Sequence, residues 1–284
     1  MSTPAATEPP GAFPRIDSHQ HFTREYLPSL LFPILKRNRF DGSVAVSSLP
    51  SAEETRWHLS LATEHSFIRA VVGWAELADP RVGDVLDEYQ RHPKFRGVCY
   101  RFAAELPQGL GELERRGLTL DVDAGFTPAI VERYPNLRVA IDHVTLAQGI
   151  GAYSPAGYAN VFAKISGLIT AAPTRWKAAE LQPAVRTALE AFGPERLMYG
   201  SDWPSYLPVG TWKEALAAFT QAIGPQSMDT REHLLGGTAR RFYRLEAGDA
   251  ASCPPGAPRQ TSRPASHCGA EPVHLLAPPE GRVR

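Results

Sequence analysis

Eight short apolar segments recur along the chain, and each is followed by a stretch with helical periodicity. The segments are rich in Val, Ile, Leu and aromatic residues and are flanked by polar residues, Gly or Pro, as strands are. They are Arg15–His19, Ser43–Ser48, Ile68–Trp74, Gly97–Arg101, Leu118–Asp123, Arg138–His143, Phe162–Gly167 and Leu197–Ser201. Because most are apolar throughout rather than alternating, they predict a buried parallel sheet.

The intervening stretches repeat apolar residues every three or four positions, which predicts amphipathic helices. Clear examples are Ala52–His65, Val82–Arg91, Pro128–Tyr134, Ala178–Phe192, Trp212–Ile223 and, after the last strand, Asp229–Tyr243. Ser51 with Glu54, and Thr211 with Glu214, have the spacing of capping boxes. Eight strand–helix units in a row predict an α/β fold that closes into a (β/α)8 TIM barrel. An open doubly wound sheet is the alternative, but the sequence contains neither a Gly-x-Gly-x-x-Gly fingerprint nor a phosphate loop.

Composition divides the chain into three parts. Residues 1–14 are small, polar and Pro-rich and predict a flexible N-terminal arm, and residues 15–245 are expected to form the barrel domain. Residues 246–284 are crowded with Pro, Ser, Gly and Arg without periodicity, which predicts a disordered C-terminal tail. The tail contains His267, Cys268 and His274, but their spacing matches no common metal site.

The bulk properties exclude several classes of protein. Among 284 residues, 30 Lys and Arg balance 30 Asp and Glu, so no overall basic field indicates a nucleic-acid partner. No apolar run approaches the roughly 20 residues that cross a bilayer, and the N-terminus lacks the pattern of a signal peptide. Three cysteines provide no disulfide framework, although a Cys253–Cys268 bridge stays open. We expect a cytoplasmic protein that acts on a small-molecule substrate without nucleic acid or membrane; a homo-oligomer is left open.

His19 and His21 are separated by one residue at the end of the first predicted strand. On a strand, side chains two positions apart point the same way, so both imidazoles lie on one face. Two imidazoles placed in this way can hold one metal ion or one carbonyl oxygen between them. A pair of polar residues at a strand end is the structural alternative, and the choice depends on what else lies nearby.

Further polar residues end the sixth, seventh and eighth predicted strands. They are Asp142 and His143, then Lys164 and Ser166 on one face of a strand, and finally Asp202. Each has a structural explanation, since an aspartate can cap a turn and a lysine can extend along a rim. In a barrel, however, catalytic groups gather at the C-terminal ends of the strands, and the eighth strand closes against the first. We therefore expect Asp202 to face the histidine pair, with His143 across the mouth.

Four motifs in this order resemble those of the amidohydrolase superfamily. They are Asp17-x-His19-x-His21, Asp142-His143, Lys164-Ile165-Ser166-Gly167-Leu168 and Tyr199-Gly200-Ser201-Asp202-Trp203-Pro204. The resemblance covers about Ile16 to Leu245 and is greatest to the sugar-lactonase branch, which includes L-fuconolactonase, L-rhamnonolactonase and 2-pyrone-4,6-dicarboxylate lactonase. It implies a hydrolase of carbohydrate metabolism that opens a sugar lactone or a related cyclic ester.

The resemblance also implies roles for individual residues. Asp202 would be the general base that activates water. His19, His21 and His143 would polarise the lactone carbonyl or, with Asp202, hold a metal. One divalent ion such as Zn²⁺ and no ion at all both stay open, because members of this branch differ in metal use. The candidate substrate-binding residues are Arg101, Lys164 and Trp203, the last of them as an apolar wall.

The chain departs from the family pattern around the predicted pocket. Cys99-Tyr100-Arg101 replaces a basic pair that ends in His, segments 102–117 and 125–136 are short, and Val144–Gln148 replaces a Gly-Lys-Pro-like turn. Loops at this end of a barrel shape the substrate pocket, so substrate recognition has either moved or been lost. A non-catalytic, ligand-binding barrel therefore stays open. So does metal-dependent decarboxylation, which is implied by a related branch with the same paired histidines.

Overall fold

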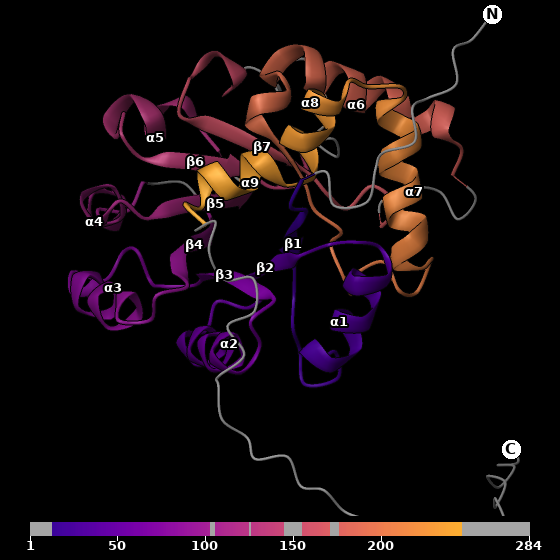
Figure 1. Ribbon diagram of the computed structural model, residues 1–284. Helices are drawn as coiled ribbons and strands as arrows, with labels where there is room; N and C mark the ends of the chain where they lie inside the picture. Colours follow the sequence, from indigo (N-terminus) through magenta and orange to yellow (C-terminus); the bar gives the residue numbers. More distant parts are fainter. Residues whose placement is uncertain (1–12, 103–105, 125, 145–154, 171–175, 246–284) are drawn as a thin grey trace, which may run out of the picture. The chain divides into compact units, whose positions relative to one another are not determined.

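Eight parallel strands form one sheet in sequence order in the computed structural model (Figure 1). The structure describes residues 13–102, 106–124, 126–144, 155–170 and 176–245. The strands are β1 (Ile16–Gln20), β2 (Gly42–Val46), β3 (Ile68–Gly73), β4 (Phe95–Arg101), β5 (Thr119–Ala124), β6 (Arg138–Ile141), β7 (Val161–Ile165) and β8 (Leu197–Tyr199). Most of the predicted N-terminal arm, the tail with its cysteines and histidines, and positions 145–148 lie outside the described residues.

The chain segment after β8 returns to β1 and closes the barrel. A parallel bridge pairs Gln20 with Trp203. The backbone N–H of Asp202 donates to the carbonyl of His19 at 2.9 Å, and that of His21 donates to Trp203 at 2.7 Å. We call this contact between residues 19–21 and 202–203 the closing seam. The predicted (β/α)8 barrel is thereby confirmed, and the open sheet is excluded.

Within the described residues, a helix follows each strand except β6, and two further helices come after the last of these (Figure 1). The helices are α1 (Pro28–Arg37), α2 (Ala52–Glu64), α3 (Val82–Gln90), α4 (Gly109–Arg116), α5 (Pro128–Arg133), α6 (Ala178–Phe192), α7 (Trp212–Ile223), α8 (Met228–Glu232) and α9 (Thr238–Phe242). The predicted outer helices α2, α3, α5, α6 and α7 are confirmed to within one residue at each end. α1 and α4 were not among the predicted helices.

The prediction of one continuous helix over Asp229–Tyr243 is wrong, because the structure has two short helices there. A π-helical turn at His233–Gly237 separates α8 from α9. Here Gly236 lies against the backbone of Pro14 and Arg15, so closely that a Cβ atom would overlap Pro14. The chain therefore bends where it meets the entry to β1, and a straight helix would collide with it.

The barrel interior is filled by small and branched side chains. They include Val44, Val46, Ala70, Val72, Ala140 and Met198, joined by Phe242 and Tyr243 from the end of α9. The hydroxyl of Thr238 donates to the carbonyl of Pro194, just before β8. α9 therefore covers the N-terminal ends of the strands, and in Figure 1 it crosses in front of them. This leaves the C-terminal ends of the strands as the place for a site.

The two predicted capping boxes differ in their outcome. Thr211 and Glu214 each accept from the other's backbone N–H, so that box is confirmed. Ser51 accepts from the N–H of Glu54, but the Glu54 carboxylate turns instead to the backbone of Ser48 and Leu49, at 3.0 and 2.9 Å. The first box is therefore only half formed. Its glutamate instead fixes the loop that follows β2.

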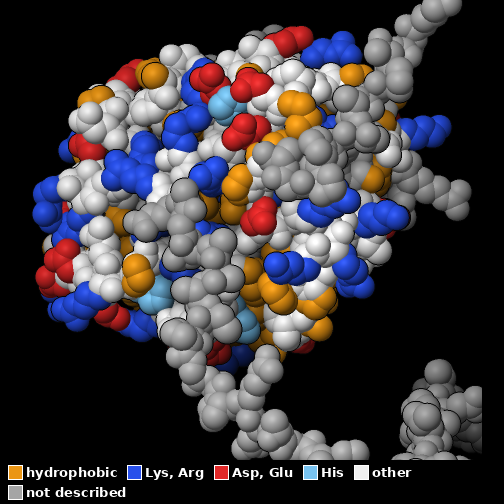
Figure 2. Space-filling view, viewed as in Figure 1, with side chains coloured by type: hydrophobic (Ala, Val, Ile, Leu, Met, Phe, Trp, Pro, Cys, Tyr) orange, Lys and Arg blue, Asp and Glu red, His pale blue; other side chains and the backbone are white. Residues whose placement is uncertain are grey.

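The outer surface agrees with the balanced composition. Lys and Arg side chains are interspersed with Asp and Glu over the face shown in Figure 2. None of the helices within the described ranges is long and apolar enough to cross a membrane.

Candidate active site

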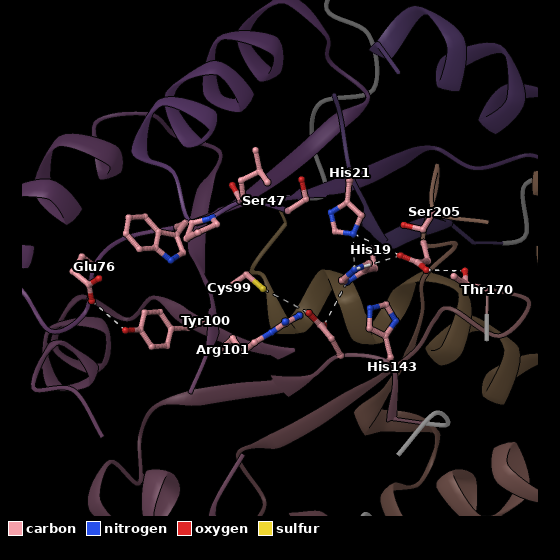
Figure 3. A pocket seen from close by; sticks show the side chains of 16 residues that line it. His19, His21, Ser47, Glu76, Cys99, Tyr100, Arg101, His143, Thr170 and Ser205 are labelled. Atoms are coloured by element: carbon pink, nitrogen blue, oxygen red, sulfur yellow. Dashed lines mark hydrogen bonds and ion pairs between the residues drawn. The ribbon is translucent and has the colours of Figure 1, made fainter. Parts of the chain in front are cut away.

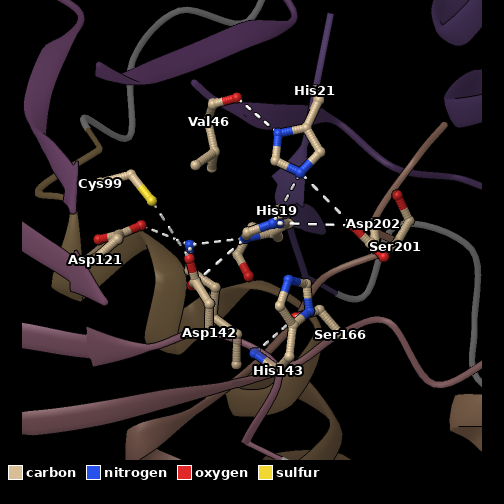
Figure 4. Close-up of polar contacts among 12 residues, drawn as sticks. His19, His21, Val46, Cys99, Asp121, Asp142, His143, Ser166, Ser201 and Asp202 are labelled. Atoms are coloured by element: carbon tan, nitrogen blue, oxygen red, sulfur yellow. Dashed lines mark hydrogen bonds and ion pairs between the residues drawn. The ribbon is translucent and has the colours of Figure 1, made fainter. Parts of the chain in front are cut away.

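Three histidines and one aspartate meet at the C-terminal ends of the strands (Figure 4). His19 belongs to β1 and His21 follows it, while His143 and Asp202 follow β6 and β8. The Nε2 atoms of His19 and His21 are 3.2 Å apart. The Asp202 Oδ1 atom lies 3.6 Å from His21 Nε2 and 4.0 Å from His19 Nε2. The ring centroids of His143 and His19 are 4.7 Å apart. The four residues that the sequence placed together therefore do lie together.

The spacing of these atoms fits one divalent ion. Ligands bound at about 2.0–2.2 Å to a tetrahedral ion lie about 3.4 Å from one another. The distances among His19 Nε2, His21 Nε2 and Asp202 Oδ1 are 3.2, 3.6 and 4.0 Å, which are close to this value. Ligand atoms of His19, His143 and Asp202 also lie within 4.8 Å of one another. The donor set is one that zinc prefers, so the residues present fit such a group.

The ring of His21 is oriented by the neighbouring strand. Its Nδ1 atom lies 2.8 Å from the carbonyl oxygen of Val46 at the end of β2. Since a carbonyl only accepts hydrogen bonds, Nδ1 carries the proton and donates it. In the neutral ring Nε2 then keeps its lone pair, which faces His19 and Asp202. Histidine ligands of metals usually make such a hydrogen bond with the ring nitrogen that does not bind the metal.

Burial and mutual contacts set the charges in this cluster. Burial lowers the pKa of His19 to about 3, so this ring is neutral at neutral pH. Burial alone would lower the pKa of His21 as well, but its contact with Asp202 raises it. For Asp202, burial opposes ionisation, yet its interaction with His21 and the neighbouring imidazoles holds the pKa below its ordinary value. Asp202 is therefore ionised at neutral pH, as a general base must be.

Two residues of the cluster have a left-handed backbone. His143 has φ +52° and Asp202 has φ +64°. Residues other than Gly rarely adopt this region, and a side chain there costs about 1–2 kcal/mol. Such strain is typical of sites where a side chain must be aimed in one direction. Here both side chains are aimed at His19.

A charged network lies directly beneath the cluster. The Lys164 Nζ atom lies 2.5 Å from Asp121 Oδ2 and 2.9 Å from Asp142 Oδ1. It also lies 3.2 Å from Nδ1 of His19. The Tyr243 hydroxyl, at the far end of the barrel, donates to Asp121 at 2.7 Å. These contacts fix His19 from below.

The network holds its charges despite complete burial. Burial would lower the pKa of Lys164, but the two carboxylates raise it well above its ordinary value. Burial likewise opposes ionisation of Asp142, yet Lys164 and His19 lower its pKa. For Asp121, burial raises the pKa to about 6. Lys164 therefore remains protonated and balances the charge of Asp142.

A cavity of about 700 Å³ opens above the cluster (Figure 3). Its described walls include His19, His21, Ser47, Ser48, Leu49, Pro50, Trp74, Glu76, Cys99, Tyr100, Arg101, Asp142, His143, Thr170, Asp202 and Ser205. Arg101, predicted from the sequence to bind substrate, lines this cavity, and in Figure 3 it points toward the histidines. Tyr100 donates to Glu76 at 3.1 Å on the same wall.

The other two residues predicted to bind substrate do not line the cavity. Lys164 is 0% exposed and lies beneath His19, where Asp121 and Asp142 already engage its ammonium group. Trp203 belongs to the closing seam, and its side chain is buried with its ring 5.6 Å from that of Tyr26. These side chains support the site rather than touch a ligand in the cavity.

Two residues that complete the site, Thr170 and Asp121, are not among those that the sequence singles out, whereas Ser166 is. The Thr170 hydroxyl donates to Asp202 Oδ2 at 3.0 Å and leaves Oδ1 facing the histidines. Ser166 Oγ lies 2.9 Å from Nδ1 of His143. Asp121 stands inside an apolar strand, and that contrast was the signal that could have identified it. Nothing comparable in the local sequence marks Thr170.

Replacing Gly200 with alanine is expected to disrupt the cluster. A Cβ atom at this position would lie 2.5 Å from Cβ of His19 and 3.1 Å from Cβ of Ser166. Such overlap forces β1 or β7 to move, and misplacement by about 1 Å can cost 10²-fold in rate. The measurement is turnover of the wild-type substrate together with thermal unfolding. Gly157→Ala, where the added carbon meets nothing within 4 Å, is the control. Wild-type activity in Gly200→Ala would contradict this packing.

The fold and the site together define a (β/α)8-barrel enzyme with a histidine–carboxylate centre at the mouth. Residues 16–245 match the amidohydrolase family, and the chain belongs to it. An L-fucono-1,5-lactonase of Burkholderia ambifaria is 32% identical, with 82% of this chain and 96% of the relative covered. A second, from Burkholderia multivorans, is 30% identical over 83% and 98% of the two chains. A crystal structure of a Burkholderia multivorans amidohydrolase with bound zinc is 29% identical, with a TM-score of 0.73 over 82% and 100%.

Proposed function

We propose that the protein hydrolyses a sugar lactone or a related cyclic ester. The observation that carries the proposal is the placement of the ionised Asp202 carboxylate within 4.0 Å of the Nε2 atoms of both His19 and His21. This group lies at the floor of a cavity large enough for a sugar ring. The relatives named L-fucono-1,5-lactonase support the same reaction.

In the proposed reaction Asp202 removes a proton from water as the water oxygen attacks the lactone carbonyl carbon. The carbonyl oxygen becomes negatively charged in the tetrahedral intermediate and lies against His19, His21 and His143. A ring N–H must donate to it, as Nε2 of His21 does when the raised pKa of this ring keeps it protonated. The bond between the carbonyl carbon and the ring oxygen then breaks, and Asp202 returns its proton to that oxygen. The product is the open-chain hydroxy acid. Arg101, on the cavity wall, is placed to bind the hydroxyl groups or the new carboxylate.

The same residues would hold a divalent ion if the enzyme uses one. His19, His21, His143 and Asp202 are the ligands that the geometry offers. When bound, the ion would polarise the carbonyl and lower the pKa of a bound water toward 7. The contact of His21 with Val46 and that of His19 with Lys164 and Asp142 orient the rings in either case.

A panel of sugar lactones tested with and without a chelator is the decisive assay. We expect ring opening of at least one aldonolactone, followed as acid release, and loss of most of that activity after chelation and dialysis. Zinc added back is expected to restore it, with metal content measured in parallel. Full activity in metal-free protein would assign carbonyl polarisation to the imidazoles alone.

The assay also separates the alternatives that the sequence left open. Release of carbon dioxide from a carboxylated acid, with no lactone opened, would replace hydrolysis by decarboxylation. Tight binding of sugar acids without turnover of any lactone would indicate a non-catalytic barrel.

A further inference from the structure

A second cavity, of about 710 Å³, adjoins the one above the histidine cluster. Ser48, Leu49 and Ser205 line both cavities, so the two meet at these residues. The residues belong to the loop after β2 and to the segment after β8. A single sugar ring whose carbonyl meets His19 and Asp202 would occupy the first cavity and leave the second empty.

Part of the lining of the second cavity is apolar. It is formed by Tyr26, Leu49, Trp57, Pro204 and Pro208. Leu49 is 59% exposed, so its side chain is accessible to a ligand in this cavity. Aromatic rings and prolines offer a rigid surface on which the C–H face of a sugar ring can pack.

Polar side chains also belong to the lining of the second cavity. Thr23, Arg24, Glu25, Ser51 and Glu53 line it and carry both donors and acceptors. Arg24 also stands 5.2 Å from the centre of the Trp57 ring and 3.9 Å from Glu53. A ligand with an apolar face and hydroxyl groups around its edge matches both kinds of side chain, whereas a purely aliphatic chain would leave the charged groups without hydrogen bonds.

The walls are held in place before any ligand binds. The Glu54 carboxylate accepts from the backbone of Ser48 and Leu49 and fixes the shared loop. On the other side, Thr23 Oγ1 accepts from the backbone N–H of Tyr26 at 3.1 Å. The Tyr26 ring packs edge-on against Trp203. A preformed surface of this kind binds without a large ordering cost.

We propose that the second cavity is a subsite for a second sugar residue. The substrates would then be lactones of disaccharide aldonic acids, with the lactone over the histidine cluster and the other sugar against Trp57. This inference rests on the proposed function for the identity of the first ring, but the subsite itself can be tested by binding alone.

The test compares two product acids, gluconic acid and the disaccharide acid cellobionic acid, by titration calorimetry. We expect cellobionic acid to bind wild-type protein about tenfold more tightly or better, the effect of a favourable contact of about 1.4 kcal/mol. Trp57→Leu should abolish most of this difference. Pro208→Trp, at an exposed loop residue, should do the same by filling the cavity without altering the core. Leu30→Ala, at an exposed leucine of α1 that lines neither cavity, is the control that should keep the difference.

Equal affinity for the two acids would overturn the subsite, as would a preference that survives both Trp57→Leu and Pro208→Trp. The hydrolysis of gluconolactone and cellobionolactone is measured separately. If neither lactone is opened while the preference for the disaccharide acid depends on Trp57, the proposed reaction is wrong and the subsite stands. If gluconolactone is opened and cellobionic acid gains nothing, the reaction stands and the subsite is wrong.

Discussion

Replacing Asp202 with asparagine is expected to reduce lactone turnover by about 10²- to 10⁴-fold, the usual contribution of a general base. The amide cannot take the proton from water, although it keeps the shape of the side chain. Asparagine also tolerates the left-handed backbone that Asp202 adopts, so the fold should be retained. The measurements are kcat for the best lactone of the panel and the melting temperature.

Two controls make the Asp202→Asn result specific. Asp84→Asn, at an exposed position on α3, removes the same charge away from the site and should leave kcat unchanged. Thr170→Val removes the hydroxyl that holds Asp202 Oδ2, and we expect a smaller loss that Thr170→Ser largely avoids. Undiminished hydrolysis by Asp202→Asn would exclude the proposed role for this carboxylate.

Replacing Lys164 with methionine is expected to give the largest loss of stability. The change leaves Asp121 and Asp142 buried without their cation, and breaking a buried ion pair in this way costs about 3–5 kcal/mol. The measurement is the free energy of unfolding in urea. Lys213→Met, at an exposed lysine of α7, is the matched control and should change stability little.

A double variant identifies the cause of this loss. Lys164→Met combined with Asp121→Asn removes one of the uncompensated carboxylates, so it should be more stable than Lys164→Met alone. Turnover should remain low in both, because His19 has lost its contact with Lys164. If the double variant is no more stable than the single one, the destabilisation comes from lost packing rather than from charge.

The clustering of His19, His21, His143 and Asp202 was predictable because it follows from topology. In a barrel of parallel strands, every strand ends at the same rim, and the last strand meets the first. Residues that come directly after strands are therefore close in space even when more than 180 positions separate them in sequence. Only the count of strands and their order had to be correct.

The support beneath the site could not be predicted in the same way. The sequence predicts that Lys164 binds substrate, but the structure pairs it with Asp121, 43 positions earlier, and with Asp142. An isolated lysine and an isolated aspartate in apolar strands do not reveal that they pair inside the barrel. The sequence also predicts that Trp203 forms an apolar wall of the pocket. Its ring instead packs against Phe22 and Tyr26, and these contacts cannot be recognised from the local sequence.

Two helices escaped prediction because their sequences contain residues that disfavour helices. α1 carries Pro33 in its interior, and α4 begins with Gly109 and contains Gly111. Proline and glycine lower intrinsic helix propensity, so the local signal is weak. Buried leucines stabilise both helices against the sheet, among them Leu31 and Leu35 in α1 and Leu110 and Leu113 in α4. Tertiary packing thus outweighed local preference.

The closing seam has a consequence for when the enzyme first becomes active. His19 is synthesised early and Asp202 late, and they meet only when the segment after β8 pairs with β1. A nascent or truncated chain that ends before Asp202 would bear both early imidazoles without their carboxylate partner. Any ligand that contacts both His19 and Asp202 would also hold the first and last strands of the folded barrel together. The free energy of unfolding should therefore rise as more of the sites are occupied.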